Sequence, residues 1–541
     1  MLSKRCGSFS SVIALLMGLI ATQVHAATSD DPSGRCKSIG PADFSQIQDA
    51  PTEIDATGVV AAQDSEPAYC RVQGYIWPQV GFELRLPLSN WNGKLIEIGC
   101  GGWCGHLGWT FWCPLRRGYA CIVSDMGHKG GEEGLWAYNN AQAQIDFGFR
   151  ATHVTALAGK AITTKFYEKP PSKSMMMGCS TGGYQGMVEA QRFPWDFDGI
   201  VSISPDMESQ AMHVLRQAWL VRNVLGADQK PVFGKEELRL LHDAALAKCD
   251  LTDGVKDGIV GDPVGCQFDP GALECKGGQT TMCLTPAQVT AARNVYSGPR
   301  TSRGAPISSR GPFAGSELRW NGFEQGWAKQ EPEDFFRYMF PFGAAGPHWT
   351  IEDLDFDHDY QRLGLASTYA DNNPDLRQFK RAGGKLILAL GGNEVAEEPG
   401  AAIDYYETVE RTMGGRPSTQ EFFRLFVVPG MDHCSGGDGA FAIDYLSALE
   451  AWVDSGEKPG RLVGAHVDQS YLLQKARESQ ETSSTEDPDW LTWGPALQLK
   501  FPLDATVPIT FTRPVYPYPL HVTYIGHGDA NKAENFKPVG P

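Results

Sequence analysis

From about residue 90 onward, short apolar runs alternate with longer stretches in which apolar residues recur at helical spacing. The most regular of these stretches extends from Ala141 to Tyr167, with Phe147, Ala151 and Val154 on one face. Strands that alternate with helices are typical of a parallel α/β sheet. The apolar runs predict its strands at Lys94–Ile98, Gly118–Ser124, Met175–Met177, Gly199–Ile203, Lys385–Leu390 and Phe423–Val428.

The alternation stops between about Pro205 and Ala382, where Gly, Pro, Cys, Trp and Asp are frequent. Because it resumes at Lys385, we interpret the middle segment as an insertion over one continuous sheet. The predicted organisation is a signal peptide at 1–26, a first core part at 27–205, a lid at 206–383 and a second core part at 384–541.

The N-terminus has the order of a secretory signal peptide. Lys4 and Arg5 precede an apolar run from Val12 to Ala21, and Val24-His25-Ala26 offers a cleavage site. A run this short does not span a bilayer, which needs about 20 apolar residues. We therefore expect a secreted or periplasmic protein without a membrane anchor, the alternative being a buried N-terminal helix.

Composition narrows the function further. The chain has 541 residues, 42% of them hydrophobic, which excludes wholesale disorder. Its net charge of −17 argues against binding to nucleic acid or to anionic membranes. Of the 13 cysteines, Cys6 leaves with the signal peptide, and 12 remain in the mature chain. An even number of cysteines in an exported chain predicts disulfides. Zinc is the alternative, because Cys100 and Cys104 are close in sequence.

A nucleophile motif follows the predicted strand at Met175–Met177. Gly178-Cys179-Ser180-Thr181-Gly182 has the pattern G-x-S-x-G and precedes a helix, the setting that gives this motif its meaning. Small neighbours allow a strained turn that exposes the Ser180 hydroxyl. The N–H of Thr181 then points to where an oxyanion develops.

A serine nucleophile needs a base and an acid that orients the base. In α/β-hydrolases the chain order is Ser, then Asp or Glu, then His. His433 lies on the loop after the last predicted strand, which suits the base. The acid is expected after the strand that ends at Leu390, where Glu394, Glu397 and Glu398 compete.

These motifs resemble the tannase and feruloyl esterase family, which includes mono(hydroxyethyl) terephthalate hydrolases. The resemblance covers nearly the whole mature chain and implies an α/β-hydrolase core with a large inserted lid. The turn around Ser180 is similar to the family's nucleophile turn, and Val428–Cys434 resembles its histidine motif. The resemblance also implies a disulfide between Cys179 and Cys434.

The acid is where this sequence departs from the family pattern. The family usually has H-G-x-x-D here, followed nine residues later by an Ile-x-Tyr-Tyr helix. In this chain Ile403-Asp404-Tyr405-Tyr406 begins nine residues after Glu394, so Glu394 takes the acid position, with Glu397 next. Leu390 stands in place of the family's histidine.

A second oxyanion donor is expected from the glycine-rich loop Gly99–Gly105, where we choose the N–H of Gly102. The alternative is that the loop is rich in glycine only to pack beneath a helix.

Three carboxylates lie close together between Cys249 and Ile259. Such carboxylates repel one another unless they are solvated or bound to a cation, and hard oxygen ligands suit Ca²⁺. The segment resembles the family's lid calcium loop, which implies side-chain ligands from Asp250, Asp253 and Asp257 and carbonyl ligands from Val255 and Ile259. A solvated turn is the alternative.

The family resemblance implies three further disulfides, Cys36–Cys70, Cys249–Cys266 and Cys275–Cys283. Cys100, Cys104, Cys113 and Cys121 remain as two pairs of open connectivity.

Together these features predict a secreted serine esterase that acts on small esters of feruloyl, galloyl or terephthaloyl type through an acyl-Ser180 intermediate. Lid aromatics could stack on the acyl ring or simply form the lid core: Trp320, Trp327, Phe335, Phe336, Tyr338 and Phe340. The alternatives are an acyltransferase with the same triad and a non-catalytic calcium-binding protein. The sequence does not define the acid, the alcohol or the oligomeric state.

Overall fold

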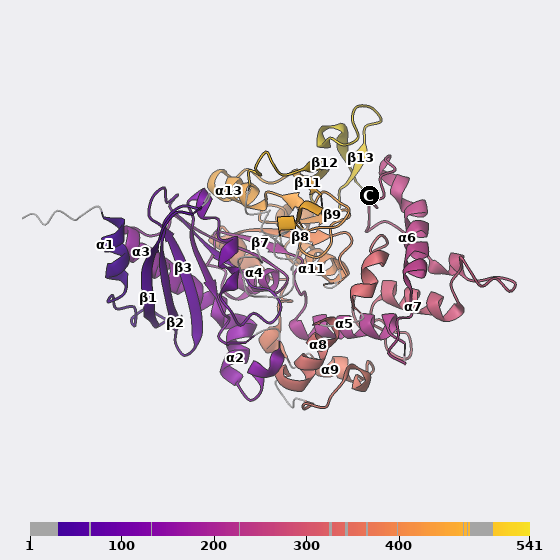
Figure 1. Ribbon diagram of the computed structural model, residues 1–541, viewed down its shortest axis with the longest axis horizontal. Helices are drawn as coiled ribbons and strands as arrows, with labels where there is room; N and C mark the ends of the chain where they lie inside the picture. Colours follow the sequence, from indigo (N-terminus) through magenta and orange to yellow (C-terminus); the bar gives the residue numbers. More distant parts are fainter. Residues whose placement is uncertain are drawn as a thin grey trace, which may run out of the picture.

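A nine-stranded mixed sheet forms the centre of the molecule (Figure 1). The computed structural model describes residues 31–540 except 64–65, 131–132, 227, 324–326, 341–344, 364–365, 396, 398, 469, 473 and 476–500. The predicted signal peptide lies outside the described residues. No helix in the described part of the chain is long and apolar enough to cross a membrane.

The strand order is β1-β2-β3-β5-β4-β6-β7-β8-β9. Neighbours from β5 to β9 pair in parallel, whereas β1, β2 and β3 add an antiparallel edge that the sequence pattern did not predict. The strands are β1 (Thr52–Val60), β2 (Tyr69–Ile76), β3 (Val80–Pro87), β4 (Lys94–Ile98), β5 (Ala120–Ser124), β6 (Lys173–Cys179), β7 (Gly199–Ile203), β8 (Lys385–Gly391) and β9 (Phe423–Val428). The predicted parallel α/β sheet is therefore confirmed.

Helices cover both faces of the parallel part of the sheet, which is why its strands β4 to β8 are buried along almost their whole length. On β6, Met176 packs with α4 (Thr181–Arg192) and α11 (Pro399–Thr412), whereas Met175 and Met177 face α13 (Tyr445–Ser455). Alternate residues of one strand thus belong to different cores. The other core helices are α1 (Pro32–Ile39), α2 (Ala141–Ile145), α3 (Ala151–Tyr167) and α12 (Arg416–Thr419).

The helix predicted from Ala141 to Tyr167 is interrupted. A π-helical segment, η4 (Asp146–Arg150), separates α2 from α3. At its centre the Gly148 backbone lies so close to Thr368 that a Cβ there would stand 2.6 Å from the Thr368 carbonyl oxygen. The close approach of a residue from the insertion gives a physical reason for the irregular turn.

The chain between the paired strands β7 and β8 is helical and stands beside the core in Figure 1. Its helices are α5 (Gln210–Val224), α6 (Lys235–Cys249), α7 (Pro286–Ser297), α8 (Trp327–Asp334), α9 (Asp359–Leu363) and α10 (Arg377–Ala382). Trp320, Phe335, Phe336 and Phe340 are buried in a hydrophobic cluster that joins this segment to the first core part, which contributes Phe147. These four aromatics are lid core.

The C-terminal part adds two small sheets above the core and next to α6 (Figure 1). One joins β10 (Ala442–Ile443), β11 (Leu462–Val467) and β12 (Ile509–Val515), and the other pairs β13 (His521–Tyr524) with β14 (Phe536–Val539). Thr523 of β13 donates a hydrogen bond to the Asp253 carbonyl oxygen at 3.2 Å, which ties the C-terminus to the acidic loop after α6.

Candidate active site

Ser180 occupies a strained turn between β6 and α4. Its backbone has φ 59° and ψ −127°, a conformation that non-glycine residues rarely adopt and that is concentrated at functional sites. The turn is tight: a Cβ on Gly178 would lie 2.4 Å from the Gly182 carbonyl group, so glycine is required there. The structure thus places Ser180 at the carboxyl end of the sheet, as the G-x-S-x-G motif predicts.

A disulfide brings the histidine loop to this turn. Cys179 and Cys434 are bonded across 255 residues of sequence, with their Cα atoms 5.8 Å apart. A ring nitrogen of His433 and the two sulfur atoms lie within 4.8 Å of one another. Since Ser180 follows Cys179 directly and His433 precedes Cys434, the bond joins the loops of the predicted nucleophile and the predicted base.

Glu394 is the carboxylate next to His433 Nδ1. Its Oε2 lies 2.8 Å from His433 Nδ1, and its Oε1 accepts the Val395 N–H at 2.9 Å. Burial disfavours the charged form of Glu394, but the His433 charge and hydrogen bond outweigh burial and lower its pKa. Burial likewise lowers the pKa of His433, and Glu394 outweighs it and raises that pKa to about 9. An imidazolium formed during catalysis is stabilised in this arrangement.

Glu397, the competing acid, has a different position. It approaches the other ring nitrogen, with Oε1 3.9 Å from His433 Nε2, and its Oε2 lies 2.7 Å from His213 Nδ1. The third candidate, Glu398, lies outside the described residues. Of Glu394 and Glu397, only Glu394 therefore lies within hydrogen-bonding distance of His433.

Asp206 and His213 join Glu397 in a buried cluster that the sequence analysis missed. One ligand-type atom from each lies within 4.8 Å of the others, and each residue is at most 4% exposed. Burial and the neighbouring Asp206 charge raise the pKa of Glu397 well above its usual value. Burial opposes ionisation of Asp206 too, but His213 and a hydrogen bond from Glu397 lower its pKa. The shared environment thus moves the pKa values of the two carboxyl groups in opposite directions.

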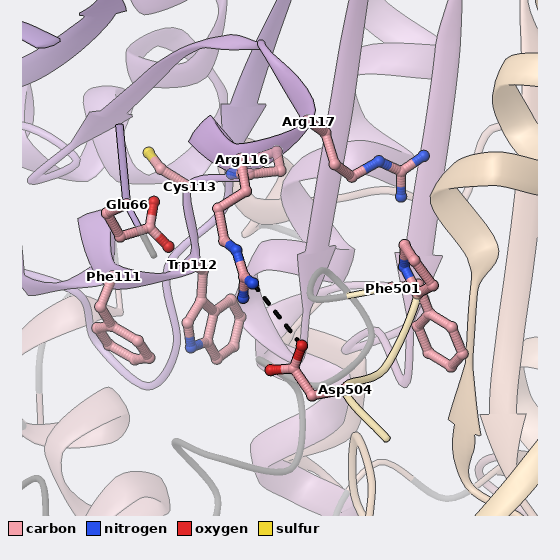
Figure 2. Close-up of a pocket in the computed structure, with 10 residues that line it drawn as sticks. Glu66, Phe111, Trp112, Cys113, Arg116, Arg117, Phe501 and Asp504 are labelled. Carbon is pink, nitrogen blue, oxygen red and sulfur yellow. Dashed lines mark ion pairs between the residues drawn. The ribbon is translucent and has the colours of Figure 1, made fainter. Parts of the chain in front are cut away.

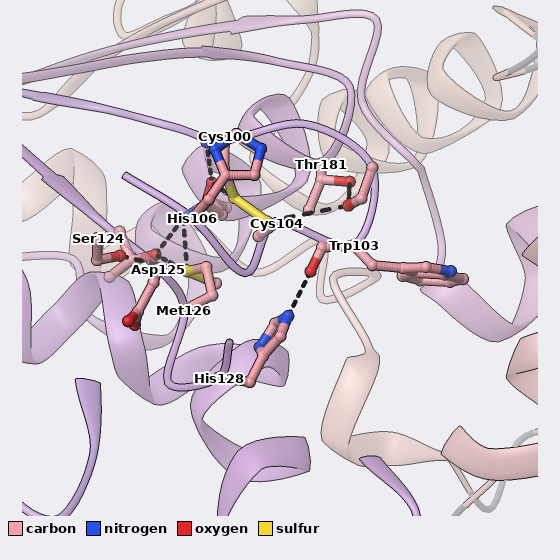
Figure 3. Close-up of a disulfide and its surroundings, with 12 residues drawn as sticks. Cys100, Trp103, Cys104, His106, Ser124, Asp125, Met126, His128 and Thr181 are labelled. Atoms are coloured by element: carbon pink, nitrogen blue, oxygen red, sulfur yellow. Dashed lines mark hydrogen bonds between the residues drawn. A yellow bond between two sulfur atoms is a disulfide. The ribbon is translucent and has the colours of Figure 1, made fainter. Parts of the chain in front are cut away.

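The glycine-rich loop after β4 lies against the serine turn (Figure 3). Thr181 Oγ1 donates a hydrogen bond to the Gly102 carbonyl oxygen at 2.7 Å, and the Cys100 N–H donates to Gln185 Oε1 at 2.9 Å. On the far side of the loop, His128 Nε2 lies 2.6 Å from the Trp103 carbonyl oxygen. The loop is thus fixed beside Thr181, the position expected of a second oxyanion donor.

The same loop contains the disulfide Cys100–Cys104, drawn in Figure 3, and a second local disulfide joins Cys113 to Cys121. These two pairs complete the connectivity that the sequence left open. Zinc at Cys100 and Cys104 is excluded, because a disulfide leaves no thiolate to bind the metal. The pairs that the family resemblance implied are all present: Cys36–Cys70, Cys249–Cys266, Cys275–Cys283 and Cys179–Cys434.

The acidic loop after α6 gathers the three predicted aspartates. Asp250 accepts the N–H groups of Asp257 and Gly258 at 3.1 and 3.3 Å, which closes the loop on itself. Burial and the nearby charges of Asp257 and Asp250 raise the pKa of Asp253 to about 6. Arg513 Nη2 of β12 lies 2.6 Å from Asp257 Oδ2 and neutralises one carboxylate. The remaining crowded oxygens are a donor set that fits Ca²⁺.

A separate cavity of about 270 Å³ lies between segments 111–117 and 501–504 (Figure 2). Arg116 and Asp504 form an ion pair across it, with nitrogen and oxygen 3.8 Å apart. Its lining includes none of Ser180, Glu394 and His433, so this cavity is not the esterase site.

Comparisons with known proteins show the family and the fold of this chain. The tannase and feruloyl esterase profile matches residues 65–539. An uncharacterized esterase from Xanthomonas campestris pv. campestris is 30% identical, covering 87% of this chain and 84% of the relative. A mono(2-hydroxyethyl) terephthalate hydrolase from Piscinibacter sakaiensis is also 30% identical, covering 90% and 87%. The crystal structure of feruloyl esterase B from Aspergillus oryzae matches with a TM-score of 0.78 and 25% identity, covering 94% and 100%. The chain belongs to the tannase and feruloyl esterase family and is a carboxylic ester hydrolase with an α/β-hydrolase core and a large inserted lid.

Proposed function

We propose that this esterase cleaves small esters of aromatic acids through a covalent acyl-Ser180 intermediate. The observation that carries the proposal is the convergence of Ser180, His433 and Glu394 through one disulfide and one hydrogen bond of 2.8 Å. Relatives named for feruloyl and terephthalate esters support an aromatic acyl group.

The proposed reaction has two halves. In the first, Ser180 Oγ attacks the ester carbonyl carbon while His433 Nε2 takes the hydroxyl proton, and the oxyanion is stabilised by the N–H groups of Thr181 and Gly102. Collapse of the tetrahedral intermediate breaks the ester C–O bond, and His433 gives its proton to the leaving alcohol. In the second half, His433 takes a proton from a water molecule that attacks the acyl-serine. The bond between the acyl carbon and Ser180 Oγ then breaks, the proton passes from His433 to Oγ, and the acid is released.

Thr181 is well placed for its part. As the first residue of α4, it has a backbone N–H without an acceptor inside the helix. The positive end of the helix dipole lies at the same place, which favours a developing negative charge.

We propose a structural calcium ion in the lid, held by the side chains of Asp250, Asp253 and Asp257 and the carbonyl oxygens of Val255 and Ile259. Its role is to neutralise the crowded carboxylates near Cys249–Cys266 and to keep the loop closed. Export of the chain is proposed on the predicted signal peptide and on the six disulfides among the described residues.

The two alternative functions make different demands. Membership of an esterase family and the ordered Glu394–His433 pair do not favour a non-catalytic binding protein. An acyltransferase would use the same intermediate with an alcohol in place of water, so product analysis with an added alcohol acceptor separates the two reactions.

The test is hydrolysis of methyl ferulate, methyl gallate and a terephthalate ester by wild type and Ser180→Ala. We expect the wild type to cleave at least one of them and the variant to lose at least about 10³-fold in kcat, because nothing else supplies the nucleophile. The variant should melt at the wild-type temperature. Activity near wild type in the pure variant would remove Ser180 from its role.

A further inference from the structure

We propose that the acyl site selects against aromatic acids that carry a second carboxylate, because acidic side chains flank the reacting serine on two sides. The inference rests on the proposed function and narrows its substrate class to uncharged acyl groups, such as hydroxylated or methoxylated benzoyl and cinnamoyl groups.

The flanking groups come from two strand ends. Asp206 follows β7, and its Oδ2 lies 3.5 Å from Thr181 Oγ1, beside the residue that follows the nucleophile. Glu397 follows β8, and its Oε1 lies 3.9 Å from His433 Nε2, the nitrogen that serves the reacting hydroxyl. An ester carbonyl bound at Ser180 is therefore bordered by one carboxyl group on the helix side and another on the histidine side.

The lid continues the acidic border above the sheet. His213 of α5 lies 2.7 Å from Glu397 and, through Nε2, 3.6 Å from Glu331 Oε2 of α8. Burial opposes protonation of His213, yet Glu397 and Asp206 outweigh it and raise its pKa well above the usual value. Three carboxyl groups, those of Asp206, Glu397 and Glu331, thus surround one imidazole. Glu394 adds a further negative charge, so the site is net negative when His433 is neutral and active.

The neighbouring arginines are held by acidic partners. Buried Arg216 lies 2.7 Å from Glu208 and donates to the Met207 carbonyl oxygen at the same distance. Arg319 pairs with Asp432, next to His433, and with Asp438, each at 3.0 Å. Neither guanidinium is left with an unmatched charge to receive a substrate carboxylate.

A second carboxylate on a benzoyl ring stays within one ring length of the carbonyl carbon. In a buried site with low effective dielectric, unit charges still interact across this distance, and salt screens them weakly. Repulsion then opposes binding of the acyl group in any orientation that keeps its ester at Ser180.

The experiment compares two esters of the same shape, methyl 4-carbamoylbenzoate and monomethyl terephthalate, at pH 8. We expect kcat/KM to favour the uncharged carbamoyl ester by at least about tenfold. Asp206→Asn and Glu331→Gln each remove one negative charge, so each should reduce this ratio at least about threefold. Because the ratio compares kcat/KM for two esters in the same variant, a general loss of activity affects both values and cancels.

Glu421→Gln is the control. This exposed acid precedes the start of β9, at the opposite end of the strands, so its loss should leave the ratio unchanged. If turnover of both esters is slow, their inhibition of methyl ferulate hydrolysis gives the same comparison. The inference would be overturned if wild type hydrolysed the two esters with equal kcat/KM, or if both inhibited methyl ferulate hydrolysis equally or not at all. It would also be overturned if neither Asp206→Asn nor Glu331→Gln changed the ratio. Hydrolysis of the panel would leave the proposed function standing in each case, whereas loss of all hydrolysis would refute the function itself.

Discussion

Carboxylates cluster in two regions of the molecule, and the groups that surround them differ between the two. At the strand ends, Glu394 and Glu397 face the ring nitrogens of His433 and His213. In the loop after α6, the aspartates face backbone N–H groups and a single arginine, Arg513. A carboxylate beside an imidazole can tune a proton transfer, whereas crowded carboxylates with too few cations of their own favour the binding of a hard cation. The carboxylates of the two regions are chemically alike, so the groups that surround them determine the role that each region can have.

The two regions also differ in how they are assembled. The active site is built from the ends of β6, β7, β8 and β9 together with α5 and α8, and it depends on a disulfide across 255 residues. The acidic loop is local, since Cys249–Cys266 closes it across 17 residues. Damage to the first should therefore appear in the rate, and damage to the second in stability.

The largest expected effect comes from Glu394→Gln. Loss of the charge beside His433 Nδ1 removes both the orientation of the ring and the stabilisation of its cation, and comparable changes in other triads cost about 10⁴-fold in kcat. We expect a loss of at least about 10²-fold in steady-state hydrolysis of the best ester.

Glu397→Gln is the matched control, because it makes the same substitution at a carboxyl group that lies 3.9 Å from Nε2 and does not hydrogen-bond to Nδ1. Its kcat for a neutral ester should fall far less than that of Glu394→Gln. A larger loss in Glu397→Gln than in Glu394→Gln would reverse the assignment of the triad acid.

Next in size is the double variant Cys179→Ala/Cys434→Ala. Freeing the two loops displaces the hydroxyl from the imidazole, and a shift of about 1 Å can cost about 100-fold in rate. We expect kcat to fall at least about tenfold, together with a stability loss of about 2–5 kcal/mol. Cys275→Ala/Cys283→Ala, which removes a bridge in the lid, should keep its rate. Equal rates in the two double variants would show that the long disulfide does not position the site.

The pH profile should show the Glu394–His433 pair directly. His433 must be neutral to accept the serine proton, and its pKa is raised to about 9, so kcat/KM should increase with pH through this value. In Glu394→Gln the raising charge is gone while burial persists, so the acidic limb should move to lower pH by about one unit or more. A limb that stays in place would mean that Glu394 does not set the pKa of His433.

The smallest expected effect on rate comes from the acidic loop. Calcium bound only to the folded chain stabilises it by mass action, about 2.7 kcal/mol at 100 times the dissociation constant. Chelation by EDTA should lower the melting temperature of wild type by several degrees, and added Ca²⁺ should restore it, with kcat little changed in the folded enzyme.

Asp253→Ala should melt low with or without EDTA, whereas Asp269→Ala, at an exposed ion pair with Arg293, should respond like wild type. If EDTA changed the melting temperature of none of the three proteins, and elemental analysis found no calcium, the proposed calcium site would be wrong.

The sequence predicted the features that depend on residues close together in the chain. The turn at Ser180, the loop of His433 and the aspartates after Cys249 are short motifs whose chemistry can be read without a fold. Asp206 and His213 gave no such signal, because an aspartate after a strand and a histidine on a helix are common. They become part of the site only when β7, β8 and α5 are folded together. The antiparallel strands β1 to β3 gave no continuous apolar run either, because charged residues such as Glu53, Arg71 and Glu83 interrupt them.

The most direct test of the central claim is labelling with a fluorophosphonate, which reacts with an activated serine and loses fluoride as Ser180 Oγ bonds to phosphorus. Mass spectrometry of the digested enzyme should find one adduct per chain, on the peptide that contains Ser180, and none in Ser180→Ala. In wild type, labelling should abolish hydrolysis in proportion to the adduct. An adduct on another residue, or full hydrolysis by an enzyme whose Ser180 is completely labelled, would contradict the acyl-Ser180 mechanism.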